Sequence, residues 1–239
     1  MFSRSEQLLG ADVMQRLHDI RVIIFGVGGV GSWCAESLIR TGLQHLTIVD
    51  YDMVQPSNIN RQSMANTQTI GQSKVEIMRS HLLSINPNAD IIAVNQRYTN
   101  KTISLPSLDP RLFSFDEYDF IIDAIDSLDD KLSLILAVTS SRAVLFSSMG
   151  AAGKIDPTQV RTTEFWKIRG CPLARALRTK MKKQKQFPSC KFQCVYSEES
   201  QIFTQIPLTP NSKGSLMSVT ATFGLTLTSM LISALQKFG

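Results

Sequence analysis

The sequence predicts an α/β fold: a Rossmann-like, doubly wound, mostly parallel sheet with helices on both faces and a basic C-terminal elaboration. Three observations support this prediction. A short apolar run at 21–25 leads directly into a glycine-rich stretch and then into a helical pattern. Further apolar runs alternate with helical segments up to about residue 150. Beyond that point both the pattern and the charge change, which indicates an addition to the core.

The predicted elements before residue 150 follow in order. Residues 21–25 (RVIIF) predict a buried strand, 29–41 a helix and 46–50 (LTIVD) a second strand, which together make a βαβ unit with a parallel sheet. A helix is predicted over 71–86, because apolar residues recur there at positions 75, 78, 82 and 85. Three more strands are predicted, at 89–94, 118–124 and 142–148.

After residue 150, two segments with alternating character predict strands, QVRTTEF (159–165) and KFQCVYS (191–197). Between them, 171–187 predicts a basic helix with Pro172 in its first turn. We find no repeat and no low-complexity linker. We therefore expect a single domain over 1–239, with a core over 1–150 and a basic elaboration and closing helix over 151–239.

The closing stretch raises the question of a membrane. Residues 215–235 carry no charge over 21 residues, which is long enough to span a bilayer. The stretch also holds several Ser and Thr residues and one Gly, and the start MFSRSEQLLG lacks the pattern of a signal peptide. We expect a buried core helix, with membrane association that is peripheral at most.

The four cysteines do not form a disulfide framework in a chain of 239 residues. Free thiols in a reducing cytoplasm are the simpler interpretation, and we expect a cytoplasmic protein. Zinc is not expected either, because Cys190 and Cys194 have no second Cys pair and no histidine near them in sequence.

Charge is distributed unevenly along the chain. Residues 1–150 contain 12 Lys and Arg against 16 Asp and Glu, whereas residues 151–239 contain 13 against 4. The apolar content of 43% excludes wholesale disorder, so the basic half is expected to present its charge on a folded surface. Such a cluster of like charge predicts an anionic partner.

The glycine-rich stretch predicts a phosphate-binding loop. Gly26, Gly28, Gly29 and Gly31 form G-x-G-G-x-G between the strand and the helix, whose N-terminus offers N–H groups to a phosphate. Asp50 ends the second strand, where a carboxylate can accept ribose hydroxyls. The alternative, a turn packed for its own sake, does not explain why strand, helix and Asp50 all fall where the motif requires them.

The residues that follow favour ATP over NAD. An enzyme that uses the terminal phosphates of ATP needs cations and a carboxylate for Mg²⁺, which Arg61, Lys74 and Asp126 can supply. Asp126 falls at the C-terminal end of a predicted parallel strand, the edge where ligands bind in such sheets. It could also cap the helix that follows, and these two roles compete.

Four motifs together resemble the ubiquitin-activating-enzyme-like superfamily, whose members adenylate carboxylates with ATP. They are GVGGVGSW, VDYDMVQPSNINRQ, GQSKVE and DAIDS, and they cover nearly all of 1–150. Within it the chain most resembles the tRNA threonylcarbamoyladenosine dehydratase family, through RSEQLLG, GAAGKIDPTQV, PLARALR, VYSEE and SVTATFG. The resemblance implies one Rossmann-like ATP-binding adenylation domain, usually a homodimer, associated with the cytoplasmic face.

The resemblance also implies roles for individual residues. Those implied to surround ATP are Gly26, Gly28, Gly29 and Gly31 in the loop, Asp50 on the ribose, Ser57, Asn58 and Arg61 around the phosphates, Lys74, and Asp126 with Ser127 beside the triphosphate. Asp126 is the Mg²⁺-linked position. Arg4 is the candidate for a finger that reaches the phosphates from the partner subunit, or else an ordinary solvated arginine. Asp126, Arg61, Lys74 and Arg4 are the implied catalytic residues.

The implied substrate is tRNA carrying threonylcarbamoyladenosine beside the anticodon. Its carboxylate attacks the α-phosphate of ATP, and a nitrogen or oxygen of the same modification then closes a ring with net loss of water. The tRNA would account for the basic half, where Arg175, Arg178, Lys182 and Lys185 follow near-helical spacing. The alternative is a solvated basic helix that promotes solubility.

Other functions stay open at this point. Carrier-activating relatives adenylate the C-terminus of a ubiquitin-like sulfur carrier, but the chain lacks their zinc pairs. An NAD-dependent oxidoreductase would leave SNINRQ and GQSK without a role, and a silent RNA-binding module would leave Arg61, Lys74 and Asp126 without one. The segment TPNSKGSLMS has no Cys, which excludes a thioester there, and we expect Cys171 to be incidental and Cys34 to lie in the core. Whether a sulfur-transfer protein assists stays open.

Overall fold

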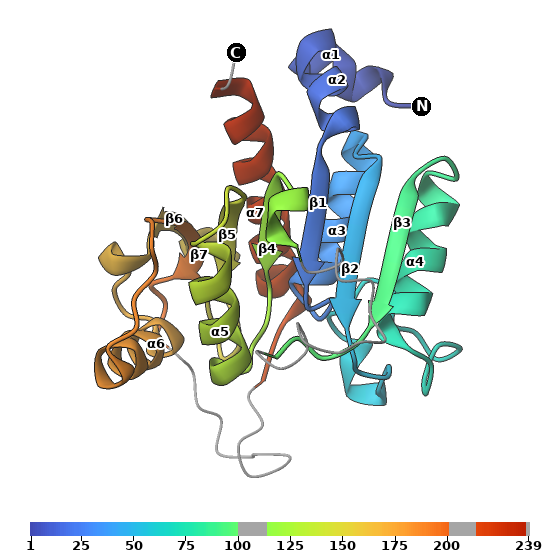
Figure 1. Ribbon diagram of the computed structural model, residues 1–239. Helices are drawn as coiled ribbons and strands as arrows, with labels where there is room; N and C mark the ends of the chain where they lie inside the picture. The colour runs from blue at the N-terminus through green and yellow to red at the C-terminus, as the bar shows by residue number, and fades with distance from the viewer. Residues whose placement is uncertain (100–113, 201–213, 238–239) are drawn as a thin grey trace.

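A seven-stranded sheet forms the centre of the molecule (Figure 1). The computed structural model describes residues 1–99, 114–200 and 214–237. In this part the strand order is β3-β2-β1-β4-β5-β7-β6, and every neighbouring pair is parallel except β6 with β7. The strands are β1 (Arg21–Phe25), β2 (His45–Asp50), β3 (Asp90–Asn95), β4 (Phe120–Asp123), β5 (Val144–Ser148), β6 (Val160–Glu164) and β7 (Gln193–Ser197).

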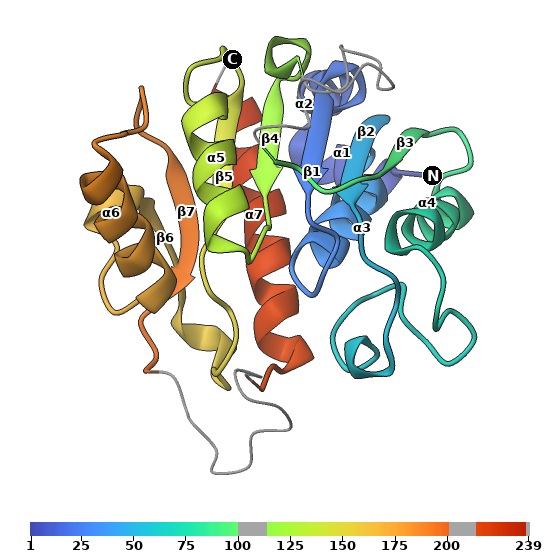
Figure 2. The same ribbon diagram turned by 60° about the horizontal axis from the view of Figure 1, so that its bottom comes forward.

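Helices cover both faces of this sheet, as Figures 1 and 2 show from two directions. The α-helices are α1 (Ser3–Leu9), α2 (Ala11–Asp19), α3 (Gly31–Thr41), α4 (Lys74–Ile85), α5 (Leu128–Val138), α6 (Pro172–Gln184) and α7 (Met217–Lys237). Short 3-10 turns add η1 (Pro56–Asn58), η3 (Phe115–Glu117), η4 (Pro157–Gln159) and η5 (Phe165–Lys167).

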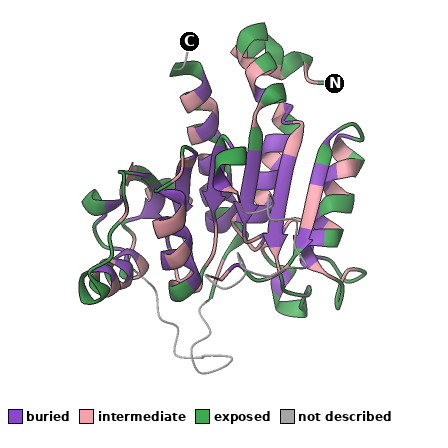
Figure 3. Cartoon of the chain, in the orientation of Figure 1, coloured by how far each residue is buried: buried purple, intermediate pink, exposed green. Residues whose placement is uncertain are grey.

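Successive side chains of each strand point to opposite faces of the sheet and pack against different helices. In β1, Val22 and Ile24 belong to the core layer that contains α3, α4 and α7. Ile23 and Phe25 point the other way and pack in the layer of α5 and α6. Four consecutive residues of β1 are therefore buried, as Figure 3 shows for the central strands, because this parallel sheet is covered on both sides.

Helix α7 is the one helix among the described residues that is long and apolar enough, by length and composition, to cross a membrane. Half of its most apolar window is buried inside the protein. It packs along α3, where the Thr228 hydroxyl donates to the carbonyl of Cys34 at 3.3 Å, and Cys34 is fully buried as expected. The prediction of a closing helix that packs back on the sheet is thus confirmed.

The predicted strands and helices are present, with shifts at their ends. Helix α3 begins at Gly31 instead of 29, because the glycine loop occupies the positions before it. Helix α6 ends at Gln184 instead of 187, because Lys185 adopts a left-handed backbone with φ of 55°. Strand β7 joins the central sheet beside β5, so residues after 150 contribute to the core as well as to its surroundings.

Candidate nucleotide site

A cavity of about 810 Å³ opens at the carboxyl ends of the strands. It lies between β1 and β4, where the strand order reverses. The strands that follow β1 are added on one side of it, toward β3, and those that follow β4 are added on the other side, toward β6. Its lining includes nine of the residues predicted to bind ATP: Gly26, Gly28, Gly29, Asp50, Asn58, Arg61, Lys74, Asp126 and Ser127.

Close packing fixes the glycine loop. Gly26 has φ of +89°, and a Cβ there would lie 2.8 Å from the carbonyl oxygen of Ala124 on the β4 side. A Cβ on Gly31 would overlap the Gly26 carbonyl oxygen. Gly31 is outside the cavity lining, and its lack of a side chain lets the loop close and α3 begin. Its predicted contact with the nucleotide stays a prediction. A Cβ on Gly28 would meet nothing closer than 3.8 Å, so this backbone faces the open cavity.

Asp50 braces the loop from the end of β2. Its carboxylate accepts hydrogen bonds from the backbone N–H of Val27 at 2.8 Å and from that of Asp52 at 3.0 Å. The remaining acceptor capacity of the two oxygens lies at the cavity, where ribose hydroxyls can use it.

Arg61 lies across the loop, with its side-chain stem against Gly29. Its guanidinium donates to the Ser57 carbonyl at 2.6 Å and to the Asn60 side chain at 3.0 Å. Burial lowers the pKa of Arg61, and the nearby carboxylate of Asp126 partly opposes that shift. Ser57 is exposed and does not line the cavity. Its backbone carbonyl orients the Arg61 guanidinium.

Lys74 is the first residue of α4, and its side chain is only 7% exposed. Its ammonium pairs with Asp52 at 2.7 Å, an interaction that holds the cation at the cavity wall. An ammonium has three N–H donors, so the pair leaves donors for a phosphate.

Asp126 and Ser127 follow β4. Ser127 is the N-cap residue of α5. Asp126 therefore does not cap this helix, which was the alternative to its predicted role at the phosphates. Asp126 is exposed and lines the cavity, and in the described part of the chain no hydrogen bond or ion pair occupies its carboxylate. A free carboxylate facing a phosphate site is suited to Mg²⁺, which usually takes one or two carboxylates plus phosphate oxygens.

The fit to Mg²⁺ depends on those phosphates. Among the described residues no group of three or more His, Cys, Asp or Glu could hold a metal ion by itself. A magnesium ion here would therefore be held by Asp126 and the nucleotide together.

A buried ion pair supports the Asp126 loop from beneath. Lys131 and Asp123 are both fully buried and lie 2.7 Å apart. Lys131 also donates to the Ile125 carbonyl at 3.0 Å, while Asp123 accepts from the Ile125 N–H at 3.1 Å and from the Ser147 hydroxyl at 2.6 Å. Ile125 is thereby held through both of its backbone polar groups, one residue before Asp126.

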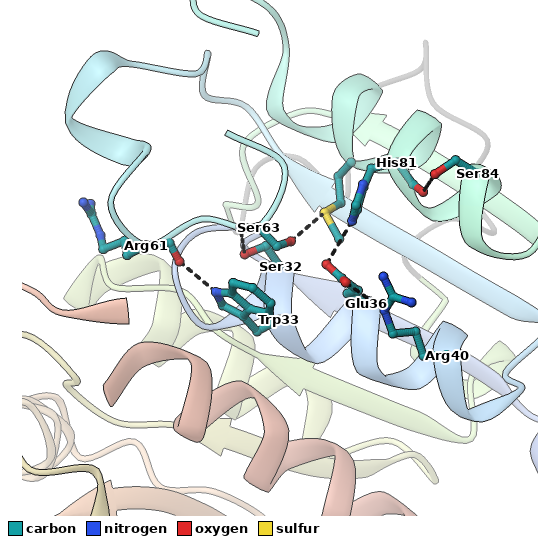
Figure 4. Close-up of polar contacts among 9 residues, drawn as sticks. Ser32, Trp33, Glu36, Arg40, Arg61, Ser63, His81 and Ser84 are labelled. Atoms are coloured by element: carbon teal, nitrogen blue, oxygen red, sulfur yellow. Dashed lines mark hydrogen bonds and ion pairs between the residues drawn. The ribbon is translucent and has the colours of Figure 1, made fainter. Parts of the chain in front are cut away.

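A polar network on α3 anchors the segment that carries Arg61 (Figure 4). The Trp33 indole N–H donates to the Arg61 carbonyl at 2.9 Å, and the backbone N–H of Ser63 donates to the Ser32 hydroxyl at 3.2 Å. Farther along α3, Glu36 joins His81 of α4 at 2.9 Å. The sequence gives no signal for these contacts, since they join residues that lie far apart in the chain.

Arg4 lies away from this cavity. It is exposed on α1, and α1 and α2 sit at the end of β1 opposite to the glycine loop (Figure 1). Arg4 does not line the cavity of its own chain, so a role there would require a second chain.

The basic helix α6 starts at the cavity, which Pro172, Leu173 and Ala176 help to line. The side chains of Arg175, Lys182 and Lys185 are exposed, as an RNA contact requires. Arg178 is different, because its guanidinium donates to three carbonyls of the η5 region, those of Phe165, Trp166 and Ile168, at 3.0–3.4 Å. The structure gives Arg178 a packing role that the helical spacing did not reveal.

The sequence profile of the ThiF family matches residues 2–239.

The chain belongs to the ThiF family.

Among curated members, the tRNA threonylcarbamoyladenosine dehydratase of Bacillus subtilis is 36% identical over 203 residues, which cover 84% of this chain and 76% of that protein. The enzyme of the same name from Escherichia coli is 32% identical over 226 residues, 92% of this chain and 80% of that protein. The crystal structure of the E. coli enzyme in complex with ATP has a TM-score of 0.85 at 32% identity, and the match covers 99% of this chain and 93% of that one.

This ThiF-family cavity also contains residues that sequence reasoning missed. Arg97 lines it just past β3, pairs with Asp130 at 2.9 Å and lies over the ring of Tyr51, which is also in the lining. Gln62 and Gln96 also line the cavity, and their side-chain oxygens are buried with no hydrogen-bond partner in the described part of the chain. Their positions after β2 and β3 were the available signal, because ligands in such sheets gather at the carboxyl ends of the strands.

Proposed function

We propose that the protein is an ATP-dependent tRNA-modifying enzyme. It adenylates the carboxylate of threonylcarbamoyladenosine next to the anticodon and closes that group into a ring with net loss of water. The observation that carries this proposal is one cavity lined by the glycine loop, Asp50, Arg61, Lys74 and Asp126, with the basic helix α6 at its rim. The match to dehydratases over most of both chains supports the substrate class.

The chemistry needs few groups beyond those in the cavity. ATP enters with its ribose at Asp50 and its phosphates against the backbone of Gly28 and Gly29. A carboxylate oxygen of the substrate attacks the α-phosphorus, the bond to the bridging oxygen breaks and pyrophosphate leaves. Arg61 and Lys74 stabilise the negative charge that develops on the phosphoryl oxygens and on the leaving pyrophosphate.

The second half of the reaction releases AMP. The mixed anhydride is attacked at its acyl carbon by a nitrogen or oxygen of the same modification, and AMP departs with the former carboxylate oxygen. That oxygen is the one lost in the net removal of water. The nucleophile belongs to the substrate, which agrees with the absence of His and Cys among the described residues that line the cavity.

Three parts of this proposal concern the surroundings of the cavity. Asp126 would hold a magnesium ion, which would neutralise phosphate charge when bound. The enzyme acts as a homodimer in the cytoplasm, in which Arg4 of one subunit approaches the phosphates of the other, since it lies far from its own cavity. Residues 1–239 act as one adenylation domain.

The proposal is tested by ATP–pyrophosphate exchange with modified tRNA, unmodified tRNA and no RNA. We expect exchange only with modified tRNA, and a loss of about 100-fold or more in Asp126→Ala, comparable to the removal of one charge-stabilising group from an active site. Asp129→Ala is the matched control, because Asp129 is an exposed carboxylate on the following helix that does not line the cavity. Exchange that requires a ubiquitin-like carrier protein instead of tRNA would overturn the substrate assignment.

A further inference from the structure

Two exposed aromatic side chains lie side by side at the β6 edge of the molecule. Trp166 in η5 is 41% exposed and Phe187, just past α6, is 53% exposed. Their ring centroids are 6.3 Å apart and their planes are tilted by 43°. Neither ring lines the nucleotide cavity. Adjacent exposed aromatic rings on a folded protein mark an interaction site more often than single exposed apolar residues do.

Trp166 is held in place from beneath. Phe165 lies edge-on to Trp166 at 5.2 Å and stacks on Phe192 at 5.0 Å, and both of these supporting rings are buried. Arg178 fixes the backbone of η5 through its bonds to the carbonyls of Phe165 and Trp166. Trp166 is thus presented on a rigid support, which lowers the entropy cost of binding.

The surface around the pair is strongly basic. Residues 161–191 contain ten Lys and Arg and one acidic residue, Glu164. Exposed cations adjoin both rings in sequence, with Lys167 next to Trp166 and Lys185 two residues before Phe187. Aromatic faces combined with backbone-neutralising cations are how proteins bind unpaired nucleic acid, because every base has a face that can stack.

We propose that Trp166 and Phe187 form a stacking platform for unpaired bases of the RNA substrate. This inference rests on the proposed function, in which the modified nucleoside lies beside the anticodon, among unpaired bases. Helix α6 runs from Leu173 at the cavity toward Phe187, and its 13 residues span roughly 20 Å at 1.5 Å per residue. One RNA loop can therefore place its modified nucleoside in the cavity and neighbouring bases on the platform.

The test measures binding without chemistry. An unmodified RNA hairpin with an unpaired loop is titrated into the full-length protein without ATP, and tryptophan fluorescence and anisotropy of a labelled hairpin are followed. We expect tryptophan fluorescence to be quenched on binding, and this quenching should be lost in Trp166→Leu, which keeps Trp33. Trp166→Leu and Phe187→Leu, which keep apolar bulk and remove the π face, should each weaken binding at least about fivefold, the equivalent of about 1 kcal/mol for one stacked base. A blunt RNA duplex of the same length should show no difference between wild type and variants.

Leu8→Ala is the matched control, since Leu8 is an exposed apolar residue on α1. Circular dichroism confirms that each variant is folded. If both aromatic variants bind the hairpin as wild type does, the platform is overturned, and the pair would then be a surface for another protein. The two proposals fail separately: hairpin binding that depends on Trp166, without any pyrophosphate exchange, would refute the tRNA-adenylation function and keep the platform.

Discussion

Lys131 supports the cavity wall although it is not among the residues that line the cavity. Its ammonium and the carboxylate of Asp123 are buried together, and both are bonded to the backbone of Ile125. Taking two charges out of water is costly, so the pair is stable only while both members are present. Together these two side chains fix the backbone of Ile125, one residue before Asp126.

We predict that Lys131→Met destabilises the protein by about 3–5 kcal/mol, because it leaves the Asp123 carboxylate buried without its cation. The double variant Asp123→Asn/Lys131→Met should recover much of that loss, since neither charge is then stranded. Urea unfolding of the single and double variants measures both values. A double variant that is as unstable as the sum of the two single variants would contradict the prediction.

At this scale the sequence predicted those cavity-lining residues that belong to compact motifs. Three glycines of the loop, Asp50, Asn58, Arg61 and Lys74 line the cavity, because each follows a strand or begins a helix at a fixed spacing. Arg97 and Lys131 were missed, because their roles arise from contacts across the sheet that no local pattern encodes. Gly31 and Arg178, which were predicted to bind ligands, also have packing roles that no local pattern revealed.

Among the elements, α3 connects the glycine loop to α4 through the carboxylate of Glu36. Burial alone would raise the pKa of Glu36, but the hydrogen bonds from His81 and Arg40 outweigh it, and the pKa lies below its ordinary value of about 4.5. The folded state therefore releases this proton more readily than the unfolded chain does. The stability that Glu36 contributes is present above about pH 4.5 and is lost as the pH falls through the lowered value.

We predict that Glu36→Gln lowers the melting temperature at pH 6 and that its difference from wild type shrinks as the pH falls below about 4.5. Thermal melts between these conditions, followed by circular dichroism, measure the change. Glu76→Gln removes an exposed carboxylate from α4 and controls for net charge. If the difference in melting temperature between Glu36→Gln and wild type stays constant with pH, the charge of Glu36 does not contribute to stability.

The elements themselves were predicted with few errors, for a physical reason. Parallel strands covered on both faces are continuous apolar runs, and the amphipathic helices between them keep their period. Helices α1 and α2 were not predicted, because only Leu17 of their residues is buried and the apolar signal is correspondingly weak. The place of β7 beside β5 was not predicted either, since pairing between distant strands is set by the whole sheet.

For the whole molecule, the uneven charge predicts how RNA binding responds to salt. Exposed Lys182 and Lys185 extend the basic surface from the cavity along α6. Phosphate contacts release counterions, so the logarithm of the binding constant falls linearly with the logarithm of salt concentration.

We predict that Lys182→Ala/Lys185→Ala weakens RNA binding at every sequence tested and reduces this salt slope by about 1–2. Anisotropy titrations at several salt concentrations give the slope. Lys237→Ala removes one positive charge from the C-terminal end of α7 and should leave the slope unchanged. An unchanged slope in the double variant would exclude these lysines as phosphate contacts.

The cavity wall is made of two segments that are far apart in the sequence and are therefore synthesised at different times, the glycine loop and the start of α7. Gly29 lies against Thr220, where a Cβ on the glycine would come within 3.3 Å of the Thr220 side chain, and the Asn60 side chain donates to the Ser215 carbonyl at 2.8 Å. At about 5–20 residues per second, Thr220 is added roughly ten to forty seconds after the glycine loop. A nascent chain with β1 to β5 complete would thus lack one wall of its nucleotide pocket, and ATP would favour folding only once α7 has emerged and docked.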